Sequence, residues 1–283
     1  MFELLLNPKK AERKPWELFF VGFFYASLAL LFVNWIFANN AVFSSYTSLL
    51  TIMFTVILSM PFVYFTMKVE EEKEVRYSYN HSLLKEHGKA IMAFLWLFLG
   101  FLLAFSMFYI LFPQLTSSNF ESQIEQYCNI NMPSNLEECI QHNTTGITAA
   151  ASNTGKIMDI FVNNVYVLIF SLIFSIVFGA GAIFILAWNA SVIATAIGIL
   201  SKSSLANLPM SLLRYMLHGL PEIAAYFTTA LAGGIIGIAI IRNDLKSDRF
   251  WHIMKNSLNL IIIALIILIV AAFIEVFVTF KIF

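Results

Sequence analysis

Three ionisable residues recur at intervals of four in one apolar stretch of the chain: Arg214, His218 and Glu222. This spacing places them one turn apart on a single stripe of an α-helix. A histidine beside a carboxylate can exchange a proton with it or share a metal ion. A catalytic zinc site uses three protein ligands, whereas His218 and Glu222 supply two, so we expect no metal here. Arg214 keeps Glu222 ionised only if Pro221 bends the helix.

The same stretch contains three further polar side chains. Together with the three ionisable residues they form a set that we call the polar hub. Its members are Asn189, Lys202, Asn207, Arg214, His218 and Glu222. A charged side chain inside a membrane span costs about 2.5–3.5 kcal/mol, so such residues are candidates for function. Two interpretations stay open. The hub either holds helices together through hydrogen bonds or lines the pocket of a transporter or channel built on discontinuous helices.

Other polar features offer less chemistry. Asn163 and Asn164 open a long apolar run, where paired amides cap a helix or bond to an outer loop. Glu275 lies in the last apolar run, where we expect it to pair with Lys281 or Arg214. No Walker loop, nucleophile elbow or dinucleotide-binding fingerprint occurs in a suitable context. We therefore expect no enzyme activity and no cofactor.

Hydrophobic runs long enough to cross a bilayer must position these residues. Of the 283 residues, 59% are hydrophobic and 12% are charged, about half the charge of a soluble domain. The continuous runs are 17–37, 43–67, 90–112, 160–187 and 256–280. The region 188–241 is interrupted by polar residues and prolines, which predicts a short helix followed by a longer one. The sequence thus predicts an all-α, polytopic transmembrane helical bundle with about seven segments.

The length of the two helices in 188–241 determines how deep in the membrane the polar hub would lie. The first of them, from Ala190 to Ser201, would be roughly 18 Å long, too short to reach the outer surface. We therefore expect the connection 202–209 to lie partly within the membrane. Irregular backbone is tolerated at that depth only where it is buried in protein or lines a wet cavity.

Basic residues predict the orientation. The stretches 1–16, 68–89 and 242–255 hold 13 of the 17 Lys and Arg residues. Loops rich in lysine and arginine remain on the cytoplasmic side of a membrane. We therefore expect a multi-pass cell-membrane protein with a cytoplasmic N-terminus and an extracytoplasmic C-terminus. Acidic and basic residues balance at 17 each, so the chain has no global field that would attract nucleic acid.

Three regions follow from this topology. Residues 1–112 form a three-span region with a mixed-charge cytoplasmic segment, 68–89, which we expect to be solvated and able to dock a partner. Residues 113–159 form an extracytoplasmic loop. Cys128 and Cys139 lie in that loop, where oxidising conditions favour a disulfide. Asn143 begins an Asn-Thr-Thr acceptor pattern for N-glycosylation, which also arises by chance. Residues 160–283 form the C-terminal membrane region.

The C-terminal region, about 160–280, resembles the stage II sporulation protein M family. The resemblance rests on these elements: Asn163-Asn164, Gly179 and Gly181, Trp188-Asn189-Ala190, the motif His218-Gly219-Leu-Pro-Glu222-Ile-Ala-Ala225, and Gly233-Gly234. The chain departs from the family pattern at Ala190, where glycine is usual, and at Pro221. The resemblance implies a membrane scaffold, which in sporulating bacteria localises peptidoglycan-degrading partners.

We therefore expect an integral membrane scaffold or assembly component. Its partners would be the lipid bilayer and a membrane or cytoplasmic protein. A homodimer through the small-residue faces around Gly179 and Gly233 stays open, and intramolecular packing is the preferred use of those faces. The alternative function is a transporter or channel with a polar site in 188–241.

Overall fold

The computed structural model describes residues 13–76, 83–112, 118–131, 139, 153–178, 182–201, 205–242 and 247–279. These residues fold into helices with no strand among them, as the hydropathy pattern predicts. The helices are α3 (Glu17–Phe37), η1 (Ser44–Tyr46), α4 (Thr47–Arg76), α5 (Leu83–Leu111), α7 (Glu121–Asn131), α9 (Asn153–Phe178), α10 (Ala182–Leu200), η3 (Leu205–Asn207), α11 (Leu208–Ile241), α12 (Asp248–Ile274) and η4 (Glu275–Thr279).

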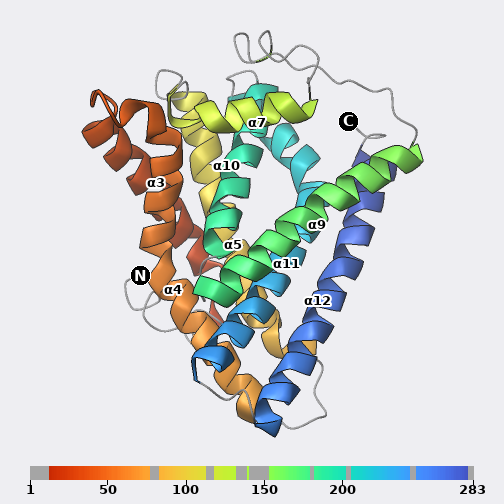
Figure 1. Cartoon of the computed structure of the whole chain (residues 1–283). Helices are drawn as coiled ribbons and strands as arrows, with labels where there is room; N and C mark the ends of the chain where they lie inside the picture. The colour runs from red at the N-terminus through yellow and green to blue at the C-terminus, as the bar shows by residue number, and fades with distance from the viewer. Residues whose placement is uncertain are drawn as a thin grey trace.

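Seven of the described helices are long and apolar enough to cross a membrane. They are α3, α4, α5, α9, α10, α11 and α12, the last together with η4. The end of α4 and the start of α12 lie at the lower end of the bundle in Figure 1. The start of α4, the short helix α7 and the end of α12 lie at the upper end. The predicted class and number of segments are therefore confirmed.

The break between two of the membrane helices lies at a different place from the one expected. The run 160–187 is not one span, because α9 ends at Phe178 and α10 begins at Ala182. Gly179 and Gly181 lie between the two helices, outside the described residues, and paired glycines favour the end of a helix. With 19 residues, α10 is about 28 Å long and crosses the bilayer unaided. The expected helix of roughly 18 Å is therefore wrong in length, and residues 202–204 of the connection lie outside the described residues.

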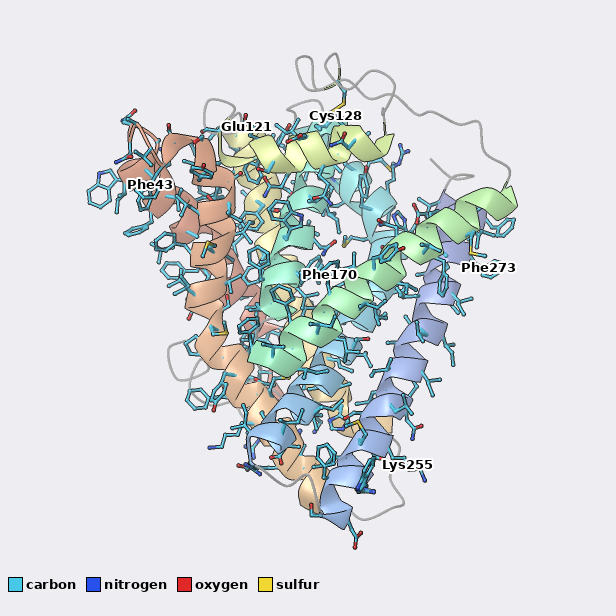
Figure 2. The ribbon with its side chains drawn as sticks, in the orientation of Figure 1. Phe43, Glu121, Cys128, Phe170, Lys255 and Phe273 are labelled. Carbon is cyan, nitrogen blue, oxygen red and sulfur yellow. A yellow bond between two sulfur atoms is a disulfide. The ribbon has the colours of Figure 1, made fainter. Side chains whose placement is uncertain are left out.

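The centre of the bundle is α11, which continues as a helix through Pro221. In its most apolar window 89% of the residues are buried, against 22% for α9 and 28% for α12. α9 runs diagonally across the bundle in front of α11 (Figure 1). Its Phe170 and the Phe273 side chain of α12 are exposed (Figure 2). Aromatic side chains on these outer faces suit contact with lipid.

Glycines set the closest helix contacts. A Cβ added to Gly100 of α5 would lie 2.2 Å from the backbone oxygen of Phe19 in α3. On the other side of the bundle, a Cβ on Gly237 of α11 would lie 2.5 Å from the oxygen of Ile176 in α9. Gly233 meets the same helix at Leu172 and Ser175. The small-residue face of α11 is thus used for packing within one chain.

Candidate functional site

A hydrogen-bonded chain joins α9 to α11 inside the bundle. The amide nitrogen Nδ2 of Asn164 donates to Oε1 of Glu222 at 2.6 Å. The Tyr226 hydroxyl donates to Oδ1 of Asn164, also at 2.6 Å. Asn164 and Tyr226 are both buried. The amide therefore uses its donor and its acceptor to link two side chains that lie one turn apart on α11.

The end of α12 adds a third helix to this group. Nδ1 of His218 lies 3.2 Å from the hydroxyl of Thr279 in η4. Glu275, at the start of η4, lies close enough to Glu222 for their carboxyl groups to interact electrostatically. We call Asn164, His218, Glu222, Tyr226, Glu275 and Thr279 the Glu222 cluster. It is positioned by α9, α11 and η4 together, so it depends on the packing of all three.

Arg214 lies between the Glu222 cluster and the short helix α7. It interacts electrostatically with His218, Tyr215 and Tyr127. The hydroxyl of Tyr215 donates a hydrogen bond to that of Tyr127, which belongs to α7. Burial raises the pKa of Tyr127, so this phenol stays protonated at neutral pH. Arg214 thus interacts both with His218 of the Glu222 cluster and with Tyr127 of α7.

The polar hub is only partly brought together. Asn189 donates to the carbonyl of Ile185 in its own helix, and Asn207 donates to the carbonyl of Ser201. Lys202 lies outside the described residues. Asn163 is exposed, whereas its neighbour Asn164 enters the Glu222 cluster. Within the described residues, no group of three or more His, Cys, Asp or Glu side chains is placed to hold a metal ion.

Sequence reasoning did not single out Tyr226 and Thr279. Tyr226 continues the stripe of Arg214, His218 and Glu222 by one more turn, so the signal was present. Thr279 is far from His218 in sequence, and no local pattern connects the two. Glu275 was expected beside Lys281 or Arg214. The structure brings it to Glu222, and Lys281 lies outside the described residues.

A second polar group, which we call the lower charged cluster, joins α4, α5 and α11 at the other end of the bundle. Nδ1 of His87 lies 2.6 Å from Glu70, whose carboxylate also contacts Lys73. Arg242 reaches Glu71 with a shortest distance of 2.7 Å. Glu70, Glu71 and His87 are completely buried. The segment 68–89 is therefore not solvated throughout, because its helices continue past the apolar run and pack together.

The short helix α7 closes the upper end of the bundle (Figures 1 and 2). Nε1 of Trp188 in α10 donates to Gln126 at 2.6 Å, and the hydroxyls of Ser48 and Ser122 lie 2.8 Å apart. Cys128 and Cys139 form a disulfide, as predicted for a loop on the oxidising side of the membrane. Asn143 lies outside the described residues. Side-chain hydrogen bonds thus connect α7 to α4 and α10.

A groove opens on the lipid-facing side between α4 and the end of α9. It has a volume of about 530 Å³ and is lined by apolar and aromatic residues. They are Ile57, Met60, Pro61, Tyr64 and Phe178. Pro61 lies inside α4, where a proline removes one backbone hydrogen bond and favours a local bend.

Comparisons with known proteins identify relatives of this chain. The stage II sporulation protein M family matches residues 90–280. The match begins well before residue 160, where the region with the motifs starts. The uncharacterized protein MJ0793 of Methanocaldococcus jannaschii is 34% identical over 129 residues. The match covers 44% of this chain and 71% of that relative. No solved structure matches the chain. The chain therefore belongs to the stage II sporulation protein M family and is a multi-pass membrane protein.

Proposed function

We propose that the protein is a non-catalytic assembly component that holds a partner membrane protein against the groove between α4 and α9. The groove carries this proposal. Its lining is apolar and aromatic, and Ile57, Tyr64 and Phe178 all expose large parts of their side chains on the membrane face. Helices associate in lipid by van der Waals packing, so a concave apolar surface suits a second membrane helix.

The hydrogen bonds inside the bundle support the same role. Asn164, Glu222 and Tyr226 bond to one another between α9 and α11, and His218 bonds to η4. Polar side chains of this kind act as links between membrane helices. Because α9 also forms one wall of the groove through Phe178, these links hold that wall in place.

We also propose a cytoplasmic N-terminus and an extracytoplasmic C-terminus. The predicted cytoplasmic stretches include the end of α4 and the start of α12, which lie together at the lower end of Figure 1. Positive residues near membrane helices favour the cytoplasmic side. A single added cysteine at the exposed Lys68 should therefore be shielded from an impermeant thiol reagent in intact cells, and one at the exposed Glu121 should be labelled. Labelling only at Lys68 would reverse the assignment.

The scaffold proposal predicts that filling the groove releases a partner. Ile57→Trp places a bulky ring in the groove, and Ile266→Trp places the same ring on α12. The two isoleucines are matched, being 57% and 55% exposed. We expect a defined membrane protein to co-purify from native membranes with the wild type and with Ile266→Trp. Its recovery with Ile57→Trp should fall at least about tenfold, as for loss of a central contact.

Equal recovery with all three chains would exclude the groove as the docking surface. If the wild type captured no reproducible partner from native membranes, the scaffold proposal itself would fail. Equal yield and thermal stability of the two variants would show that the added ring leaves the bundle folded.

A further inference from the structure

Three polar side chains are buried without a hydrogen-bond partner where the short helix α7 meets α4. Asn119 and Gln123 are 1% and 0% exposed, and Thr51 of α4 is 1% exposed. Among the described residues, no group bonds to either polar atom of the two amides or to the Thr51 hydroxyl. Buried polar atoms in native proteins nearly always have a partner, either protein or ordered water. These five atoms therefore indicate a partner that the described chain does not supply.

Two hydrogen bonds between the start of α4 and the start of α7 bring these side chains together. The Thr47 hydroxyl donates to the carbonyl of Ser118 at 2.9 Å, and the hydroxyls of Ser48 and Ser122 lie 2.8 Å apart. Each of the two amides directly follows one of these α7 serines in the sequence, and Thr51 lies one turn beyond Thr47 on α4. All three residues are therefore within one turn of the same two contacts. We call them the amide cluster.

The Thr51 hydroxyl differs from the next hydroxyls along α4. A buried serine or threonine inside a helix commonly donates to the backbone carbonyl one turn earlier. Thr55 donates in this way to the carbonyl of Thr51 at 2.8 Å, and Ser59 donates to that of Thr55 at 2.7 Å. Within the described structure, the Thr51 hydroxyl makes no such bond. It is therefore available to a molecule held at the contact between α4 and α7.

The charges around the amide cluster favour a neutral ligand. Among the described residues, the buried charged side chains are Glu70, Glu71 and His87, which lie at the opposite end of the bundle from α7 (Figure 1). Glu121 of α7 is exposed. A bound ion would therefore have no buried counter-charge, which makes its burial costly. Amides and hydroxyls both donate and accept hydrogen bonds, and water is a small neutral molecule that can do the same.

The position of Thr51 along α4 places the amide cluster within reach of water. Thr51 stands 20 residues before Glu71, or about 30 Å along the helix, which equals the thickness of the hydrocarbon layer. Glu71 pairs with Arg242 at the lower end of the bundle. The amide cluster therefore lies near the opposite boundary of the membrane, on the side of α7, where water is present.

We propose that the amide cluster is a buried hydration site, in which ordered water joins α7 to α4. A buried water makes about three hydrogen bonds, so about two waters satisfy the five unpartnered atoms. Apolar contacts complete the seat of α7, because the ring of Phe120 lies 6.0 Å from that of Phe105 and 5.5 Å from that of Tyr109, both in α5. This site lies apart from the groove and does not depend on the proposed scaffold function.

Radiolytic footprinting of the full-length purified protein tests this proposal. Brief irradiation converts bound water as well as bulk water into hydroxyl radicals, which oxidise the aromatic rings beside them. Phe120 lies between the two amides in the sequence and is 2% exposed, so bulk solvent scarcely reaches it. We expect Phe120 to be oxidised in the wild type. Phe101 of α5 is 0% exposed within the apolar core and should stay unmodified.

Asn119→Leu combined with Gln123→Leu replaces both amides by apolar side chains and should abolish the oxidation of Phe120. Asn129→Leu changes an exposed amide of the same helix and should keep it. Oxidation of Phe120 that is no greater than that of Phe101 would overturn the proposal, and so would oxidation that persists unchanged in the double variant. The first comparison uses only the wild type, so it decides the question even if the double variant does not fold.

Discussion

Arg242→Met is expected to destabilise the protein more than any other single charge removal at the lower end of the bundle. Arg242 contacts the completely buried carboxylate of Glu71 at 2.7 Å. Removing one partner of a buried ion pair costs about 3–5 kcal/mol, because the other charge stays in a low-dielectric site. Arg242 keeps a third of its side chain exposed, so we expect a cost near about 3 kcal/mol, the lower end of that range.

Lys68→Met provides the control, because Lys68 is exposed on the same helix as Glu71. We expect it to change the free energy of unfolding by less than about 0.5 kcal/mol, as for most surface sites. Denaturant titration in detergent micelles measures both changes. The double variant Glu71→Gln with Arg242→Met should cost less than the sum of the two single changes, because the residues are directly coupled. Equal destabilisation by Lys68→Met and Arg242→Met would contradict the buried pair.

Gly100→Ala is expected to destabilise the contact between α3 and α5. The added Cβ would lie 2.2 Å from the oxygen of Phe19, 2.7 Å from the nitrogen of Phe23 and 3.0 Å from Cα of Gly22. All three atoms are backbone, so no side chain can rotate away and the helices must separate. Overpacking of this kind costs about 1–3 kcal/mol or more. The free energy of unfolding should fall by an amount in this range.

Gly88→Ala on the same helix is the matched control. A Cβ at Gly88 would meet nothing within 4 Å. Alanine is favoured over glycine in a helix by about 0.8–1.0 kcal/mol, so this variant should be neutral or more stable. The two substitutions are chemically identical and are expected to have opposite signs. A gain in stability at both positions would show that α3 and α5 are not in close contact at Gly100.

The sequence predicted the class of fold well and the position of one break poorly. Runs of apolar residues between charged flanks indicate membrane helices directly, since the bilayer sets their length. The break after Phe178 was missed because Gly179 and Gly181 are apolar by hydropathy and left the run unbroken. The hydropathy pattern predicted the end of one span at residue 187 and the start of the next helix at Ala190, yet α10 runs through both positions as one helix. The start of α10 therefore follows two glycines, which favour a helix end, and not the polar residue Asn189.

The sequence likewise predicted only some residues of the candidate site. Helical spacing identified His218 and Glu222, since residues four apart share a face whatever the fold. The partners Asn164, Glu275 and Thr279 come from other helices, and only packing brings them to α11. The run around Glu70 and Glu71 was read as solvated from its mixed charge. Its burial depends on α5 and α11 supplying His87 and Arg242.

Photocrosslinking in native membranes tests most directly the claim that the groove receives a partner. A photoreactive residue would replace Tyr64 in the groove or Ile269 on α12, which are 45% and 44% exposed. We expect an adduct of one defined size from position 64 and none of that size from position 269. Adducts that are the same at both positions, or absent from position 64 while the chain is fully inserted, would contradict it.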